Sequence, residues 1–378
     1  MLSQEENARY ARHFSLDQVG VEGQEKLKKS SVLCIGAGGL GSPSCLYLAA
    51  AGVGRIGIVD PDVVELSNLQ RQILHSQSSI GQSKLESGAA RLQDINPHVK
   101  VDQHNTRFSA ANAIDIASQY DIIIDGTDNF PTRYLSNDVA YLLKKPNIYA
   151  SIFRFEGQLS VFAPHLGGPC YRCMLPEPPD ANSVPSCAEA GVLGVLPGIM
   201  GSLQAMEAIK IILNCGSPPL GRLIHYDALG TTFREFNLRR DPECPLCGSN
   251  PSITELADYQ YICNDTKSNN DKIMQQPYEI NVEQLKNKLD QSFDGLLIDV
   301  RESWEHSATN IASARHIPMG EIPDFVPDLK NMGTEQELLI ICKSGGRSAR
   351  VMDYLSDQGF SNVYNVIGGM DAWSKLTP

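Results

Sequence analysis

The sequence lacks the features of a membrane-spanning or secreted protein. No stretch approaches 18 consecutive apolar residues, which is close to the length that a membrane-spanning helix needs. Residues 1–15 are polar and contain no apolar segment of the kind found in secretory signals. The sequence therefore predicts a cytoplasmic protein that has no membrane partner.

An excess of basic residues is also absent. The chain holds 32 Lys and Arg against 44 Asp and Glu, which gives a formal net charge of −12. A nucleic-acid-binding protein needs a basic face for phosphate contacts, so this class is excluded. The 378 residues, 42% hydrophobic and 20% charged, are ordinary for a soluble protein of about two to three domains.

A disulfide framework is not expected, because the ten cysteines occur without a secretory signal. Four of them form two C-x2-C pairs, Cys170 with Cys173 and Cys244 with Cys247. Four thiolates in two pairs fit a closed tetrahedral zinc site with a structural role, and redox chemistry is the alternative. The cysteines in or beside apolar stretches, predicted to be small buried hydrophobic residues, are Cys34, Cys45, Cys215 and Cys263.

Short apolar runs alternate with helical patterns in the first part of the chain. Predicted strands at 31–36 and 55–60 flank a predicted helix at 40–51, which makes a βαβ unit. A proline-rich polar segment, 174–190, is predicted to be a long exposed loop. Further predicted elements are strands at 121–125, 149–152 and 157–162 and a helix at 202–214.

A polar segment marks the predicted boundary between two domains. Residues 264–276 are almost devoid of apolar side chains and are predicted to be a linker between domains at 1–263 and 277–378. In the second domain, apolar runs at 295–300 and 337–342 and a helical pattern at 348–358 alternate again. The sequence thus predicts an α/β fold in both domains, with a parallel sheet in the smaller one.

A glycine loop, Gly36-Ala-Gly-Gly-Leu-Gly41, follows the first predicted strand and opens a helix. Such a loop places backbone N–H groups against a phosphate, and Asp60 at the end of the next strand suits a ribose hydroxyl. Alone, the loop is more often typical of a nicotinamide or flavin dinucleotide. Two downstream cations, Arg71 and Lys84, and a carboxylate for Mg²⁺, Asp128, favour ATP.

The motifs of residues 1–263 resemble the ThiF/MoeB branch of the ubiquitin-activating enzyme superfamily. In order they are Arg-Tyr-x-Arg, the glycine loop, Ala-Ala-Gly-Val-Gly, Asp-x-Asp, Ser-Asn-Leu-Gln-Arg-Gln, Thr-Asp-Asn and the C-x2-C pairs. The resemblance implies a Rossmann-like fold, a homodimer, and adenylation of the C-terminal glycine of a ubiquitin-like sulfur carrier of the MoaD or ThiS kind. It implies that ATP and Mg²⁺ are held by Gly39, Asp60, Ser67, Asn68, Leu69, Gln70, Arg71, Lys84, Asp128 and Asn129, with Arg12 reaching the other subunit's nucleotide.

The chemistry of adenylation explains why these residue types are needed. Attack of a carboxylate on the α-phosphorus of ATP brings two anions together, so cations and a metal must offset the repulsion. Arg71, Lys84 and a metal on Asp128 are the catalytic candidates for this task, and no nucleophilic side chain is required.

Residues 277–378 resemble a rhodanese domain. The matching segments are Asp299-Val-Arg-Glu, Ala314-Arg-His-Ile-Pro, the loop Cys342-Lys-Ser-Gly-Gly-Arg347 and Gly368-Gly-Met-Asp-Ala-Trp. Backbone N–H groups of the loop, together with Lys343 and Arg347, are expected to favour a thiolate or persulfide anion on Cys342. The family's usual Gly-His-Ile segment is replaced by Thr309-Asn-Ile. A buried structural cysteine is the alternative for Cys342.

Phosphate chemistry and sulfur chemistry on one chain indicate consecutive steps of one reaction. The predicted product is a carrier thiocarboxylate, with sulfur supplied by a cysteine desulfurase or a small thiol donor such as thiosulfate. Cys187 matches a loop cysteine that the family uses to attack the adenylate or to resolve the acyl-persulfide adduct, although a non-essential role stays open. A nicotinamide-dependent oxidoreductase and a binding module with inert loops are the rival classes. The destination of the sulfur, in molybdopterin, thiamin, cysteine or a tRNA thiouridine, also stays open.

Overall fold

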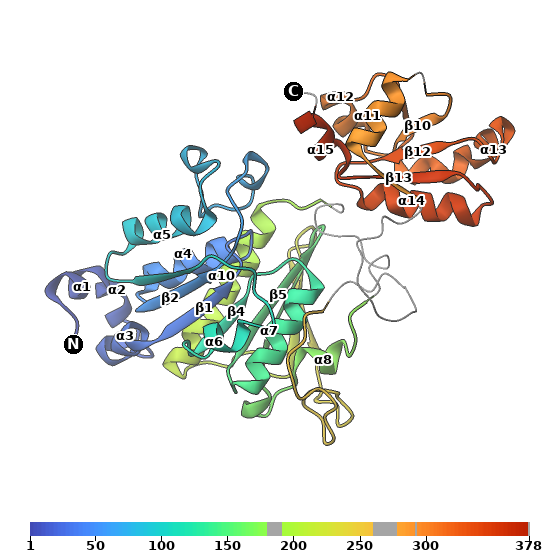
Figure 1. Cartoon of the computed structure of the whole chain (residues 1–378). Coiled ribbons are helices and arrows are strands. Elements are labelled where there is room, and N and C mark those ends of the chain that lie inside the picture. The colour runs from blue at the N-terminus through green and yellow to red at the C-terminus, as the bar shows by residue number, and fades with distance from the viewer. Residues whose placement is uncertain (180–190, 260–277, 292, 377–378) are drawn as a thin grey trace. The chain divides into compact units, whose positions relative to one another are not determined.

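The computed structural model describes residues 1–179, 191–259, 278–291 and 293–376 (Figure 1). It divides into two compact units, Met1–Asp265 and Thr266–Pro378. The predicted linker 264–276, Cys187 and Cys263 lie outside the described residues.

The first unit is built on an eight-stranded sheet in the order β3-β2-β1-β4-β5-β6-β7-β8. The five strands from β3 to β5 are parallel, and β6, β7 and β8 are antiparallel. The mixed α/β, parallel-rich prediction is therefore confirmed. The strands are β1 (Ser31–Ile35), β2 (Arg55–Val59), β3 (Lys100–His104), β4 (Ile122–Asp125), β5 (Asn147–Phe153), β6 (Glu156–Phe162), β7 (Arg222–Asp227) and β8 (Thr232–Asn237).

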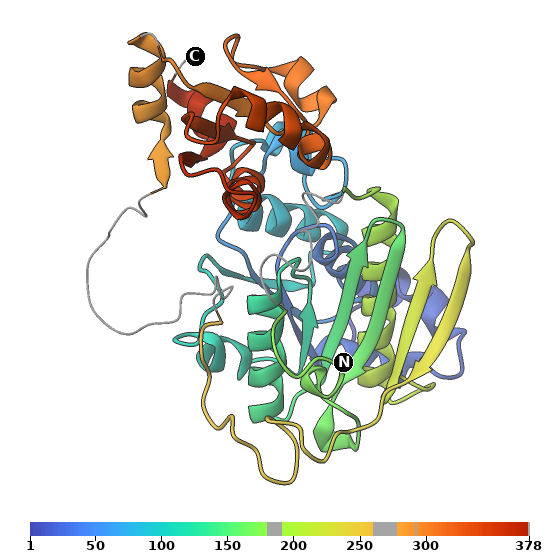
Figure 2. The ribbon, with the colours of Figure 1, turned by 90° about the vertical axis from the view of Figure 1, so that its right-hand side faces the viewer.

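Helices cover both faces of this sheet because its central strands are apolar on both sides. In β1, Val32 and Cys34 join the core formed with α4, α5 and α10, whereas Leu33 and Ile35 join the core formed with α6 and α7. Figure 2 shows α10 lying along the strands β5 and β6, which it contacts. The helices are α1 (Gln4–Arg9), α2 (Ala11–Phe14), α3 (Gly20–Lys29), α4 (Gly41–Ala51), α5 (Lys84–Ile95), α6 (Ala113–Ala117), α7 (Phe130–Leu142), α8 (Tyr171–Met174) and α10 (Val195–Leu213).

Helix α10 differs from its prediction, since it begins at Val195 rather than at Ser202. Residues 195–201 include Pro197, Gly198 and Gly201, which are poor helix formers, but Leu196, Pro197 and Met200 are buried in the core and packing stabilises the turn. By length and composition this helix could cross a membrane. It packs instead against α4, β5 and β6, as a core helix does.

The second unit has a five-stranded, entirely parallel sheet in the order β11-β10-β12-β13-β9. One core includes residues of α13 and α14, and the other includes residues of α11 and α15. The predicted parallel sheet is confirmed. The elements are β9 (Glu279–Asn281), α11 (Val282–Asp290), β10 (Leu296–Asp299), α12 (Ser303–Ala308), β11 (Arg315–His316), α13 (Ile322–Met332), β12 (Leu338–Ile341), α14 (Gly346–Asp357), β13 (Val363–Ile367) and α15 (Gly369–Leu376).

Candidate active sites and metal centre

A cavity of 820 Å³ opens at the carboxyl ends of β1, β2 and β4 in the first unit. The chain reaches β1 before β2 and β3 on one side and β4 on the other, so the cavity lies where the strand order reverses. Ligands of open α/β sheets bind at this point. Of the predicted ATP residues, those that line the cavity are Gly39, Asp60, Gln70, Arg71, Lys84, Asp128 and Asn129.

The backbone of the glycine loop packs too closely on itself to admit a side chain at Gly41. A Cβ on Gly41 would lie 2.0 Å from the carbonyl oxygen of Gly36, whose φ of 95° favours glycine. Two buried side chains fix Ala37 of the loop: Asp60 Oδ2 accepts its N–H at 2.9 Å, and His75 Nε2 lies 3.1 Å from its carbonyl oxygen. The loop is thus a rigid cradle at the start of α4, which suits a phosphate.

Lys84 is the first residue of α5 and is only 6% exposed. Its Nζ lies 2.7 Å from Asp62 Oδ2 and 3.5 Å from Asp60 Oδ1. The two carboxylates fix the ammonium at the cavity wall. Asp62 also lines the cavity, and it is the partner that positions this cation. The sequence identified it only as part of the Asp-x-Asp motif.

Ser67, Asn68 and Leu69 do not line the cavity. They lie in and directly after a 3-10 turn, Leu66–Asn68, which Asn68 closes because its Oδ1 accepts the backbone N–H of Glu65 at 3.1 Å. Arg71 Nη1 donates to the carbonyl oxygen of Ser67 at 3.2 Å. The turn therefore positions Gln70 and Arg71 at the cavity.

Asp128 and Asn129 follow β4 and differ in what they contact. Asn129 is the N-cap of α7, because its Oδ1 accepts the backbone N–H of Thr132. Asp128 is exposed to the cavity, and no hydrogen bond or ion pair holds its carboxylate within the described part of the chain. Its oxygens are hard ligands of the kind that Mg²⁺ prefers.

Arg133 is a cavity residue that sequence reasoning missed. It is 7% exposed, its guanidinium lies between the rings of Phe130 and Tyr149, and Nη2 donates to the carbonyl oxygen of Thr127. Its Nε and the Oε1 of Gln72, also at the cavity, are buried with no hydrogen-bond partner among the described residues. Buried polar atoms of this kind are completed by water, an ion or a polar ligand, so the cavity wall offers polar groups to what it binds.

Arg12 lies elsewhere, exposed on α2 and not at the wall of this cavity. Beside it, His13 borders a second cavity of 330 Å³. Two large apolar side chains at that cavity are exposed, Tyr47 at 59% and Met206 at 52%.

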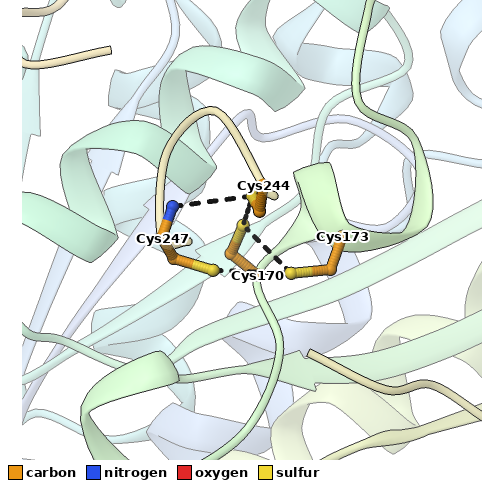
Figure 3. Close-up of side chains that lie close together, drawn as sticks. All are labelled: Cys170, Cys173, Cys244 and Cys247. Atoms are coloured by element: carbon orange, nitrogen blue, oxygen red, sulfur yellow. Dashed lines mark hydrogen bonds between the residues drawn. The ribbon is translucent and has the colours of Figure 1, made fainter. Parts of the chain in front are cut away.

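The four cysteines of the C-x2-C pairs meet in one cluster (Figure 3). Their sulfur atoms all lie within 4.8 Å of one another, with separations of 3.5 Å from Cys170 to Cys244 and 3.4 Å from Cys173 to Cys247. Zinc with bonds of about 2.3 Å needs sulfur atoms about 3.8 Å apart in a tetrahedron. The cluster fits zinc, and since it has four protein ligands it leaves no open position for catalysis.

In the second unit, Cys342 follows β12 and is 1% exposed. Its Sγ accepts hydrogen bonds from the Gly345 backbone N–H at 3.1 Å and from Ser348 Oγ at 3.2 Å. The backbone of the loop is also fixed, because the Met370 N–H at the start of α15 donates to the Cys342 carbonyl oxygen. Donors aimed at the sulfur favour its anionic form.

Arg347 contacts a carboxylate that the sequence analysis did not identify. Its two terminal nitrogens lie 2.6 and 2.7 Å from the carboxylate oxygens of Glu305, which is mostly buried. The expectation that this cation favours the sulfur anion stays a prediction, and the structure adds Glu305 as a partner that shares its charge. Burial alone would raise the pKa of Glu305, but the hydrogen bonds and charge of Arg347 lower it.

Comparison with known proteins agrees with this geometry. The ThiF family matches residues 10–246 and the rhodanese-like domain matches residues 281–376. A probable adenylyltransferase/sulfurtransferase MoeZ of Mycobacterium tuberculosis is 45% identical over 99% of this chain and 94% of its own. A sulfur carrier protein adenylyltransferase of Thermus thermophilus is 51% identical over 69% of this chain and 98% of its own. Among solved structures, E. coli MccB with ATP has a TM-score of 0.55 at 26% identity, covering 65% of this chain and 75% of its own.

Proposed function

We propose a two-step reaction for this chain, which belongs to the ThiF family and carries a rhodanese-like domain C-terminal to its ThiF part. The first step adenylates the C-terminal glycine of a ubiquitin-like sulfur carrier of the MoaD or ThiS kind, and the second replaces the adenylate by sulfur. The observation that carries the proposal is the presence of two prepared sites on one chain. One is a phosphate cavity with fixed cations, and the other is a buried cysteine with hydrogen-bond donors on its sulfur.

In the first step, ATP would lie with its phosphates at the glycine loop. The cations Arg71 and Lys84 line the cavity, so they offset the negative charge when the carrier's carboxylate approaches the α-phosphorus. Asp128 would hold Mg²⁺, which supplies further positive charge at the phosphates. A carboxylate oxygen bonds to the α-phosphorus while the bond to the β-phosphate oxygen breaks, giving acyl-adenylate and pyrophosphate.

In the second step, Cys342 would carry the sulfur as a persulfide obtained from a cysteine desulfurase or from thiosulfate. The terminal sulfur attacks the acyl carbon and displaces AMP, which leaves the carrier joined to Cys342 through two sulfur atoms. A second thiol, for which we propose Cys187, then breaks the S–S bond and releases the thiocarboxylate. The disulfide left behind must be reduced by an external thiol.

The proposal also includes a homodimer, a structural zinc ion and a cytoplasmic location. A homodimer is supported by the second cavity, which His13 borders, since pairing of two copies there would cover Tyr47 and Met206. The reach of Arg12 to the partner's nucleotide is what the family resemblance implies. Zinc would occupy the cysteine cluster and tie the chain together, without entering the reaction. A cytoplasmic location suits chemistry that depends on free thiols.

The test is mass spectrometry of a carrier incubated with ATP, Mg²⁺ and thiosulfate, which should detect one oxygen replaced by sulfur. Asp128→Asn and Arg71→Ala should abolish carrier-dependent ATP–pyrophosphate exchange while leaving thiosulfate–cyanide sulfur transfer intact, because that chemistry needs only the second unit. Exchange near the wild-type rate in both variants would contradict the ATP assignment. Tight NAD binding without exchange would favour the oxidoreductase alternative.

A further inference from the structure

The hydroxyl of Ser348 lies among three hydrogen-bond acceptors. Ser348 Oγ is 3.2 Å from Cys342 Sγ, 3.0 Å from the carbonyl oxygen of Gly345 and 2.7 Å from Asn365 Oδ1. A hydroxyl has a single proton to donate, together with two lone pairs that accept. The shortest contact, with Asn365, therefore competes with the sulfur for that proton.

The side-chain amide of Asn365 can resolve this competition. Asn365 is 3% exposed and lies on β13 opposite Ile340 of β12, the strand that leads into Cys342. A half-turn of the amide exchanges its oxygen and nitrogen while the atoms keep nearly the same positions. With the oxygen toward Ser348 the amide takes the hydroxyl proton, whereas with the nitrogen toward Ser348 it donates its own.

We propose that Asn365 is a positioning residue for sulfur transfer, whose amide turns with the charge on Cys342 and directs the Ser348 proton onto the anionic sulfur. With a neutral thiol, the S–H group donates to Ser348 Oγ and Ser348 donates to Asn365 Oδ1. With a thiolate or persulfide anion, Asn365 Nδ2 donates to Ser348 Oγ and Ser348 donates to the sulfur. The thiol proton leaves to solvent when the thiolate forms, and apart from that loss only hydrogen bonds change. The inference rests on the proposed role of Cys342.

Two neutral donors contact the sulfur directly, the Gly345 N–H and the Ser348 hydroxyl, while Arg347 binds Glu305 through both terminal nitrogens. The hydroxyl donates to the sulfur only when neither Asn365 nor the Gly345 carbonyl oxygen takes its proton. The elements around the loop carry further charged groups, all unchanged by substitution of Ser348 or Asn365: Glu279, Asp299, Arg301, Glu305, Lys343, Arg347, Arg350, Asp353 and Asp371.

The pH dependence of Cys342 alkylation tests the proposal in the full-length chain. Iodoacetamide reacts with the thiolate, so the labelling rate of the peptide that contains Cys342 gives the midpoint pH of ionisation by mass spectrometry. Ser348→Ala should raise the midpoint by about one pH unit, a tenfold slower reaction below it, because the sulfur loses this donor. Asn365→Ala should raise the midpoint by less, because the hydroxyl remains but loses the amide N–H that supports its donation to the sulfur. The double variant should match Ser348→Ala, because Asn365 acts through that hydroxyl.

Two further variants guard against a purely structural effect. Asn362→Ala removes a half-buried asparagine just before β13 that donates to Glu335 and should leave the midpoint unchanged. Asn365→Asp keeps the shape but offers only acceptors, so it should raise the midpoint even if Asn365→Ala fails to fold.

A wild-type midpoint in Asn365→Asp, or a second full shift in the double variant, would overturn the proposal. Alkylation needs no sulfur donor, so this result stands apart from the proposed function. The proposed function itself fails if wild-type protein forms no persulfide on Cys342.

Discussion

Loss of a single zinc ligand should destabilise the first unit strongly. Cys244→Ser replaces a buried thiolate of the cysteine cluster with a hydroxyl, which is a weak zinc ligand. The cluster joins the segment 170–173 to the segment 244–247, and Cys244 lies 74 positions after Cys170. When the metal leaves, this cross-link is lost together with its four bonds.

The loop length sets the size of the effect. A cross-link that closes a loop of 74 positions contributes about 4 kcal/mol through chain entropy alone. For a unit of this size, 1 kcal/mol lowers the unfolding temperature by about 2–4 °C. The variant should therefore unfold about 8–16 °C below the wild type. This figure is a lower bound on the metal's contribution, because structural zinc binds small peptides with about 10–16 kcal/mol.

Metal analysis and calorimetry check the prediction. Wild-type protein should contain one zinc per chain, and Cys244→Ser should contain almost none. Cys215→Ser is the matched control, because Cys215 is a half-buried cysteine at the end of α10, outside the cluster. A Cys244→Ser variant that keeps its zinc, or that unfolds at the temperature of the Cys215→Ser control, would refute the reasoning. Folded wild-type protein without zinc would refute it as well.

Three other predictions concern the reaction and its support. Arg12→Ala should lose pyrophosphate exchange alone but regain part of it in mixed dimers with Asp128→Asn, and no recovery would exclude a role across subunits. Cys187→Ala should keep exchange and sulfur transfer to cyanide yet form no thiocarboxylate, whereas wild-type thiocarboxylate formation under a physiological reductant would make Cys187 dispensable. Glu305 has a lowered folded-state pKa, so its stabilisation of the second unit is present above its ordinary value of 4.5 and is lost as the pH falls through the folded value. Both tryptophans of the chain lie in the second unit, so their fluorescence in urea should show Glu305→Gln destabilising that unit more at pH 7 than in acid.

Much of the fold could be predicted from apolar runs. The strands β1, β2 and β4 are buried on both faces, so each appears in the sequence as a short continuous apolar segment. The edge strand β8 could not be found in this way, because every residue in it is exposed and Phe233 and Phe236 fall on opposite faces. Its pairing with β7 is a tertiary contact that the local pattern does not record.

The sequence could predict those site residues that directly follow a parallel strand. Asp60 follows β2 and Asp128 follows β4, and parallel strands bring their carboxyl ends to one edge. The sequence could not distinguish residues that line the cavity from those that support it, such as Asn68 in its 3-10 turn. Arg133 escaped notice because an arginine within a helix is normally a solvated surface residue, and only the fold places it against Phe130 and Tyr149.

The motif from Cys342 to Arg347 does not by itself determine the charge around the sulfur. The spacing from Cys342 to Arg347 places a cation near the sulfur, but Glu305, 42 positions earlier, binds that cation through two hydrogen bonds. An arginine paired in this way attracts a doubly charged phosphate less than an unpaired arginine would, and a singly charged sulfur anion also receives hydrogen bonds from the Gly345 N–H and the Ser348 hydroxyl. The preference for sulfur therefore depends on the partner of Arg347 as well as on the loop, and Glu305→Gln should weaken this preference because the charge of Arg347 is then no longer offset.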